Sequence, residues 1–254
     1  MTSITADNLG VRFLFDKHRR VVTPNLARLR RGVTEAWGLR HLSLTASAGD
    51  GIALLGSSGS GKTTLLRALA GIFPADEGSV TVDGQIASLL SIDAGLLPPL
   101  TGRENAALLM TLGGLLRSEA RERLDDVRER SQLDVQFERP VSSYSQGMRA
   151  RLSLGASDTF EASVLLLDEV HEALDHQFRS VLDAHTEALL ASGGIVVAAG
   201  HDHPMLARLC PRALWLEGGR VRAEGPFQDV LDAYLGSLEE SPETRSLRAF
   251  SAPQ

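Results

Sequence analysis

Short runs of apolar residues that end in polar or glycine-rich turns dominate the sequence pattern of this chain. Residues 51–55, 164–167 and 195–199 are apolar at every position, as is typical of strands covered on both faces of a sheet. Residues 63–70 instead carry apolar positions at helical spacing, and Gly71 is placed to end that helix. A strand, a glycine-rich turn and a helix in this order predict the start of a parallel α/β core.

Further strands are predicted on both sides of this core. They cover residues 4–15, 41–45, 79–82 and 86–90, and a closing hairpin covers residues 214–222. Strands therefore recur from the start of the chain to near its end without an internal repeat. This distribution is typical of one α/β unit.

The pattern between these strands, over residues 96–159, is mostly helical. Thr101 and Glu104 form a capping-box pattern at the start of an apolar helix that we expect to run through residues 106–116. Residues 118–130 are charged and predict a helix that faces solvent. We therefore predict a helical subdomain inserted into the α/β core.

Composition is that of an ordinary globular protein, with 254 residues, 43% hydrophobic and 23% charged. The net charge of −6 gives no reason to expect a nucleic-acid partner. Cys210 is the single cysteine, which excludes a disulfide within the chain and favours a reducing, cytoplasmic setting. Residues 1–4 lack a signal-peptide layout, and the longest apolar run, residues 106–116, is too short for a bilayer span of about 20 residues.

Residues 56–63 read Gly-Ser-Ser-Gly-Ser-Gly-Lys-Thr and match the pattern of a phosphate-binding loop, or P-loop. Glycines let successive backbone N–H groups face phosphate oxygens at a helix N-terminus, where the partial positive charge favours anions. We expect Lys62 to reach the β- and γ-phosphates and the Thr63 hydroxyl to bind Mg²⁺. A flexible serine-glycine turn is the alternative, but the position between a strand and a helix favours nucleotide binding. The residues predicted to bind nucleotide here are Gly56, Ser57, Ser58, Gly59, Ser60, Gly61, Lys62, Thr63 and Thr64.

Titratable side chains follow two of the apolar strands. Asp168 and Glu169 follow residues 164–167, and His201 follows residues 195–199. Because ligands bind at the carboxyl ends of parallel strands, we predict that Asp168 holds Mg²⁺ through a water molecule and that Glu169 orients or deprotonates the attacking water. His201 is expected to contact the γ-phosphate and that water. Alone, two acids after a strand more often form a plain turn and a single histidine is usually structural, so these predictions depend on the P-loop.

The order of these motifs resembles that of ABC-transporter ATPase subunits over about residues 4–236. The motifs that carry the resemblance are residues 56–63, residues 144–147 (Tyr-Ser-Gln-Gly), residues 165–169, residues 173–175 (Ala-Leu-Asp) and His201. The resemblance implies an α/β fold, with a P-loop NTPase core, an antiparallel β subdomain and a helical subdomain inserted at about residues 96–159. It also implies one nucleotide-binding domain, residues 1–238, and a C-terminal tail, residues 239–254.

The same resemblance implies a nucleotide site shared by two subunits. In this family two subunits pack head to tail, and the P-loop of one and the signature turn of the other enclose each ATP. Ser145, Gln146 and Gly147 would hold the γ-phosphate from the far side, so that loss of this phosphate loosens the interface. The implied D-loop consists of Ala173, Leu174 and Asp175.

Several segments narrow the resemblance to ATPases that export bacterial cell-surface polysaccharides such as O-antigens, capsules, teichoic acids and galactan-type polymers. They are residues 144–152 (Tyr-Ser-x-Gly-Met-x-x-Arg-Leu), residues 95–105, residues 209–215 with Gly225 and Tyr234 following, and Val170 after Glu169. The implied cargo is a lipid-linked polysaccharide.

The chain also departs from the family pattern. Residues 92–94 stand where a glutamine is usual, and Gln146 stands where a small residue is expected. His171 and Glu172 precede the D-loop where Thr-Ser is commoner; drift on a loop and altered communication across the dimer are both open. Phe13 is the expected aromatic for adenine stacking, with Phe15 and Trp37 as rivals and a plain core phenylalanine as the alternative.

Residues 16–35 are rich in arginine and contain few acids. This segment is either a solvated charged loop or a surface for anionic lipid headgroups or a lipid-linked pyrophosphate.

We predict the ATP-hydrolysing subunit of an ABC exporter, with ATP and Mg²⁺ as cofactors. Its expected partners are a second copy of itself, two copies of a transmembrane permease and, through the permease, a lipid-linked polysaccharide. The expected location is the cytoplasmic face of the bacterial membrane. Alternatives are an exporter ATPase for another cargo, such as a drug or small lipid, and a soluble ABC ATPase without a transport role.

Overall fold

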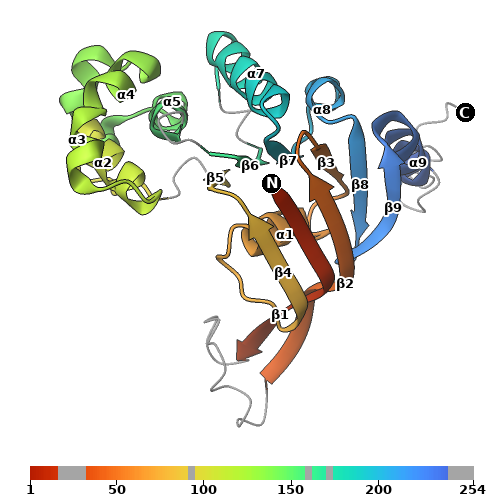
Figure 1. Ribbon diagram of the computed structural model, residues 1–254. Coiled ribbons are helices and arrows are strands. Elements are labelled where there is room, and N and C mark those ends of the chain that lie inside the picture. Colours follow the sequence, from red (N-terminus) through yellow and green to blue (C-terminus); the bar gives the residue numbers. More distant parts are fainter. Residues whose placement is uncertain (17–32, 91–94, 158–161, 170–173, 240–254) are drawn as a thin grey trace, which may run out of the picture.

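The computed structural model of the protein describes residues 1–16, 33–90, 95–157, 162–169 and 174–239. Its larger sheet has the strands β3 Gly51–Leu55, β5 Ile86–Leu89, β6 Val164–Asp168, β7 Ile195–Ala199, β8 Arg212–Glu217 and β9 Arg220–Pro226. The helices that cover this sheet are α1 Lys62–Leu69, α7 His176–Ala191, α8 His203–Leu209 and α9 Phe227–Glu239. The strand order is β5-β6-β7-β3-β8-β9, parallel throughout except for the β8–β9 hairpin (Figure 1).

Both faces of the larger sheet are buried, which explains its uninterrupted apolar sequence runs. Within β3, Ile52 and Leu54 point to the cluster that contains α1, whereas Ala53 and Leu55 point to the cluster that contains α7, α8 and α9. Successive strand residues face opposite sides of a sheet, so an apolar residue is needed at every position. The predicted parallel α/β core is confirmed.

A smaller antiparallel sheet lies beside the core, over α1 (Figure 1). Its strands are β1 Ser3–Asp16, β2 Val33–Ser47 and β4 Glu77–Asp83, in the order β2-β1-β4. The prediction of a short strand at residues 41–45 was wrong in length, because the long strand β1 supplies pairing partners back to Val33. Residues 17–32 of the arginine-rich segment lie outside the described residues.

The helical segment between β5 and β6 has a hydrophobic core of its own, which includes Met110, Val127 and Phe137. Its elements are α2 Gly102–Leu112, α3 Arg117–Glu122, α4 Leu124–Ser131, the 3₁₀ helices η2 Asp134–Glu138 and η3 Val141–Ser143, and α5 Gln146–Ser157. The predicted capping box is present: the Glu104 N–H donates to Thr101 Oγ1 at 3.1 Å, and the Thr101 N–H donates to Glu104 Oε2 at 2.8 Å.

Two helix predictions in this segment need correction. The first helix ends at Leu112 and not at residue 116, because Gly113 and Gly114 follow and Gly114 has φ +102°. The charged stretch at residues 118–130 is broken into α3 and α4 at Arg123 and is not wholly solvent-facing. Its apolar residues Ala120, Leu124 and Val127 are buried in the core of the segment.

Arg212 connects the two sheets. This contact gives a structural reason for the presence of an arginine in residues 209–215, one of the segments that carry the subfamily resemblance. Its Nη2 donates to the Thr45 carbonyl at 2.8 Å in β2, and its Nε donates to Glu224 Oε1 at 3.1 Å in β9. Asp50 Oδ2 lies 3.5 Å from Nη1. A charged group with this many partners fixes the position of the smaller sheet relative to the core.

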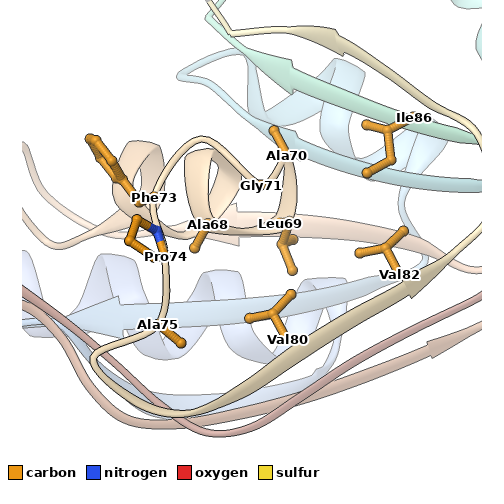
Figure 2. Close-up of a pocket in the computed structure, with 10 residues that line it drawn as sticks. All are labelled: Ala68, Leu69, Ala70, Gly71, Phe73, Pro74, Ala75, Val80, Val82 and Ile86. Carbon is orange, nitrogen blue, oxygen red and sulfur yellow. The ribbon is translucent and has the colours of Figure 1, made fainter. Parts of the chain in front are cut away.

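An apolar cavity of about 340 Å³ opens between the end of α1 and β4 (Figure 2). Its lining is Ala68, Leu69, Ala70, Gly71, Phe73, Pro74, Ala75, Val80, Val82 and Ile86. None of these side chains is charged or carries a hydroxyl group, so the cavity offers a phosphate no side-chain partner.

Gly102 is expected to be intolerant of any side chain. A Cβ at this position would lie 2.2 Å from Tyr144 Oη and 2.9 Å from the Phe137 carbonyl oxygen. We therefore predict that Gly102→Ala lowers the free energy of unfolding by about 1–3 kcal/mol, although alanine is the better helix former. Urea unfolding at 25 °C measures the change.

Gly236 is the matched control, since it lies in α9 and nothing stands within 4 Å of its would-be Cβ. Gly236→Ala should stabilise the protein by about 0.5–1 kcal/mol. Adding Tyr144→Phe to Gly102→Ala should recover part of the loss. Equal effects of the two glycine substitutions would refute the steric explanation.

Candidate functional site

The P-loop joins β3 to α1 and uses glycine where the backbone requires it. Gly56, Gly59 and Gly61 have φ values of +142°, +78° and +113°. A Cβ on Gly56 would lie 2.3 Å from the Leu216 carbonyl oxygen, whereas nothing lies within 4 Å of a Cβ on Gly59. The loop is thus packed against β8 at its base and open at its tip, as a loop that receives a ligand should be.

Lys62 is the first residue of α1 and is only 7% exposed. Its Nζ donates to the carbonyl oxygens of Gly56 at 2.6 Å and Ser57 at 3.1 Å, so the ammonium group lies within the curve of the P-loop. Burial lowers the pKa of Lys62, and the nearby carboxylates of Glu169 and Asp168 act in the opposite direction. The result is a positive charge held where phosphate oxygens would enter.

Asp168 ends β6 and lies against the start of α1. Burial raises the pKa of this carboxyl, and a hydrogen bond from the Thr63 hydroxyl is the main opposing effect. A hydroxyl and a carboxylate in contact beside a lysine ammonium form a set of hard oxygen ligands that suits Mg²⁺. The donor set therefore fits the metal predicted from the sequence.

Glu169 and His201 meet at the carboxyl edge of neighbouring strands, because Asp168 pairs with Ala199 across β6 and β7. His201 Nε2 lies 3.4 Å from Glu169 Oε1, and both side chains are more than half exposed. Glu169 has φ +56°, and its N–H donates to the Ala199 carbonyl at 2.9 Å. A glutamate in the left-handed region is uncommon, and the fixed backbone directs its carboxylate out of the sheet edge.

Two of the three aromatic candidates, Phe13 and Trp37, lie on opposite faces of the smaller sheet. A Cβ on Gly38 would meet both Phe13 Cε2 at 2.4 Å and Thr64 Cγ2 at 3.1 Å, so Phe13 lies on the P-loop side. Trp37 pairs with Arg12 on the other face, and the guanidinium groups of Arg12 and Arg40 lie 5.5 and 5.2 Å from the centre of its ring. The side chain of Phe15 lies outside the described side chains. Phe13 also packs edge-on against Phe73 at 5.5 Å, so part of its ring belongs to the core.

The signature turn, residues 144–148, lies at the start of α5 in the helical segment, whereas the P-loop lies at the start of α1 (Figure 1). Ser145 caps α5 by accepting the Met148 N–H at 3.2 Å. Gln146 is exposed, so its side chain does not displace the turn. The two motifs therefore belong to separate parts of the molecule.

The described D-loop residues, Leu174 and Asp175, directly precede α7. Asp175 caps this helix by accepting the Phe178 N–H at 3.0 Å, and Leu174 is buried in the core. Ala173 lies outside the described residues, as do Val170, His171, Glu172 and residues 92–94. Asp175 therefore has a structural role in its own chain whatever it contacts in a partner.

A comparison with protein-family models decides the identity of the fold and site. The ABC transporter model matches residues 39–172, which is more than half of the 254-residue chain. The chain belongs to the ABC transporter family. It is an ABC ATPase that binds and hydrolyses ATP, as the sequence predicted.

Similar curated proteins include the O-antigen export system ATP-binding protein RfbB of Klebsiella pneumoniae, 33% identical over 79% of this chain and 81% of that protein. RfbE of Yersinia enterocolitica is 30% identical over 91% of this chain and 100% of its own length. The teichoic acids export protein TagH of Staphylococcus saprophyticus is 34% identical over 80% of this chain and 77% of its own. These relatives confirm the resemblance to the polysaccharide exporter subfamily.

The fold of this ABC ATPase is also that of solved cassettes. A dimeric ATP-binding cassette, MJ0796, bound to ADP and Pi has a TM-score of 0.71 at 20% identity, covering 88% of this chain and 98% of the other. The predicted fold class is thereby confirmed. No helix in the described part of the chain is long and apolar enough to span a membrane.

Sequence reasoning did not single out Asn105 or explain Tyr144. Asn105 is fully buried, and Tyr144 is 5% exposed with its hydroxyl donating to the Gln136 carbonyl at 2.7 Å. Burial raises the pKa of Tyr144 to about 12, so it stays a neutral hydrogen-bond donor. The only available signal was their presence in the segments that carry the subfamily resemblance.

Proposed function

We propose that this ABC ATPase drives the export of a lipid-linked cell-surface polysaccharide through a separate membrane permease. The observation that carries the proposal is the match, at 30% identity or more over most of the chain, to export proteins for two kinds of surface polymer. O-antigens and teichoic acids are both polymers of sugar or sugar-like units, so the proposed cargo is a polymer of this class. We further propose residues 1–238 as one nucleotide-binding domain with residues 96–159 inserted, and residues 239–254 as its tail.

Each residue of the site is proposed for one role. Lys62 holds the β- and γ-phosphates through its buried ammonium, and the backbone N–H groups of residues 56–63 bind the remaining phosphate oxygens. Thr63 and Asp168 would hold Mg²⁺, which neutralises phosphate charge when bound. Glu169 accepts the proton of the attacking water, and His201, 3.4 Å away, fixes its carboxylate and contacts the γ-phosphate.

The second half of the site comes from another copy of this chain. Ser145 and Gly147 of the partner subunit would face the γ-phosphate at the positive end of α5. Support comes from the separation of the signature turn and the P-loop within one chain (Figure 1). Phe13 beside Thr64 is proposed to stack on adenine, and the D-loop residues Leu174 and Asp175 to line the same interface.

A groove of about 370 Å³ between the core and the helical segment is the proposed contact for the permease. Ile72 and Leu112 line it and are 57% and 69% exposed. Two exposed apolar side chains that line one groove favour a surface that another protein covers. In the exporter, one permease copy would occupy the groove of each ATPase subunit at the cytoplasmic face of the membrane.

The test is ATP hydrolysis by the protein assembled with its permease in lipid vesicles. Lipid-linked polysaccharide should stimulate hydrolysis several-fold, and the matching lipid carrier without polymer should not. Stimulation by a small drug or simple lipid alone would assign a different cargo. Hydrolysis that is complete without any permease and does not respond to it would favour an ABC ATPase without a transport role.

A further inference from the structure

Asn105 lies in the first turn of α2, and both polar atoms of its side-chain amide hydrogen-bond to one loop. Its Oδ1 accepts the Leu97 N–H at 2.7 Å, and its Nδ2 lies 3.1, 3.1 and 2.9 Å from the carbonyl oxygens of Leu97, Leu100 and Thr101. Asn105 is fully buried, so these bonds form away from water. It thereby holds both ends of the loop at residues 97–101 against α2.

The same loop is hydrogen-bonded to the segment that leads into the signature turn. The Val141 N–H donates to the Leu100 carbonyl at 2.9 Å, and the Ser142 N–H donates to the Pro98 carbonyl at 2.9 Å. Thr101 and Pro140 form an antiparallel bridge beside these bonds. A shift of the loop would therefore carry this segment with it or break two backbone hydrogen bonds.

The connection continues from that segment to Ser145. The Tyr144 N–H donates to the Val141 carbonyl at 3.0 Å, and the buried Tyr144 ring is fixed by its hydroxyl bond to Gln136. Ser145 follows directly and closes the first turn of α5, because its Oγ accepts the Met148 N–H and its carbonyl accepts the Arg149 N–H at 3.1 Å.

The other end of the connection is at the surface. Leu97 is 48% exposed, and Pro98 and Pro99 are also exposed, so three apolar side chains form the tip of the loop. We infer that Asn105 is a positioning residue for Ser145, which acts through the loop at residues 97–101 and couples its exposed tip to the signature turn. The assignment of the permease as the protein that contacts this tip rests on the proposed function. The link from Asn105 to Ser145 does not depend on it.

Hydrogen exchange of two variants tests whether Asn105 positions Ser145 or stabilises only its own loop and α2. Asn105→Ala removes the amide, whereas Met110→Ala is the matched control, since Met110 is fully buried in the same helix and has only apolar packing to lose. At conditions of equal global stability, the Met148 and Arg149 amides should exchange about tenfold faster in Asn105→Ala than in Met110→Ala. Acceleration that stops at Ser142, or that is equal in both variants, would overturn the inference.

Native-state exchange of the unsubstituted protein gives a test that does not depend on a variant folding. In low denaturant, the amides of Leu97, Val141, Ser142, Met148 and Arg149 should open as one cooperative unit with one free energy. Opening of Met148 and Arg149 together with the rest of α5, and separately from Leu97 and Val141, would refute the coupling.

A nucleotide experiment then measures the consequence. In a Glu169→Gln background, Asn105→Ala should leave ATP affinity of the monomer within about twofold and raise the ATP concentration for half-maximal dimerisation about tenfold. Unchanged dimerisation would contradict the inference. If Glu169→Gln alone fails to dimerise with ATP, the proposed shared site fails, while the exchange results still decide the role of Asn105.

Discussion

Replacement of Glu169 by glutamine is expected to reduce ATP hydrolysis by about 10²–10³-fold while ATP-driven dimerisation persists. The amide has the size of the carboxylate but cannot accept a proton from water, so the chemical step fails. In the proposed site, ATP binding depends on other groups, namely Lys62, the P-loop backbone and the partner's Ser145. Removal of a negative charge beside the γ-phosphate would also reduce repulsion in the closed dimer.

Steady-state phosphate release and size-exclusion chromatography with ATP measure the two effects. Glu187→Gln, an exposed glutamate of α7, is the control for loss of one carboxylate and should hydrolyse ATP normally. Hydrolysis at the normal rate in Glu169→Gln would transfer the role of base to another group. Loss of both hydrolysis and dimerisation would contradict the proposed site shared by two subunits.

The parts of the fold that follow from local physics were predictable from the sequence. The apolar runs of β3, β6 and β7 indicate burial on both faces, and the P-loop glycines occupy backbone conformations that other residues avoid. The capping box at Thr101 was read correctly because both of its hydrogen bonds span only three residues. The ends of β2 and α2 were not, since a distant partner strand extends the first and a glycine pair shortens the second.

The contacts that connect distant residues were not predictable in the same way. Asn105 reads as an ordinary polar helix residue, because its loop partners depend on how residues 97–101 fold back on α2. Arg212 reads as a surface arginine until β2 and β9 are brought beside it. Both residues stood in segments that resemble the polysaccharide exporters, and the structure supplies a physical reason for their presence there.

Lys62→Met is expected to lower ATP affinity about 10- to 100-fold and to abolish measurable hydrolysis, while the fold remains intact. Hydrogen bonds from a charged donor to phosphate are roughly twice as strong as neutral ones, and methionine of similar length offers none. The substitution Lys62→Met should change the folding stability of the chain only slightly. Burial lowers the pKa of Lys62, which means that the charged form is disfavoured in the folded state. Removal of this buried charge therefore offsets the loss of the two hydrogen bonds to the Gly56 and Ser57 carbonyls.

Nucleotide titration and thermal unfolding distinguish these two effects in one preparation. We expect the free energy of unfolding without ATP to change by less than about 1 kcal/mol, and ATP to give little of the thermal stabilisation that it gives the unsubstituted protein. Arg117→Met, which removes an exposed positive charge in α3, should keep full stabilisation by ATP. Undiminished ATP affinity in Lys62→Met would mean that the buried ammonium serves only the Gly56 and Ser57 carbonyls, and the assignment of phosphate binding to Lys62 would be withdrawn.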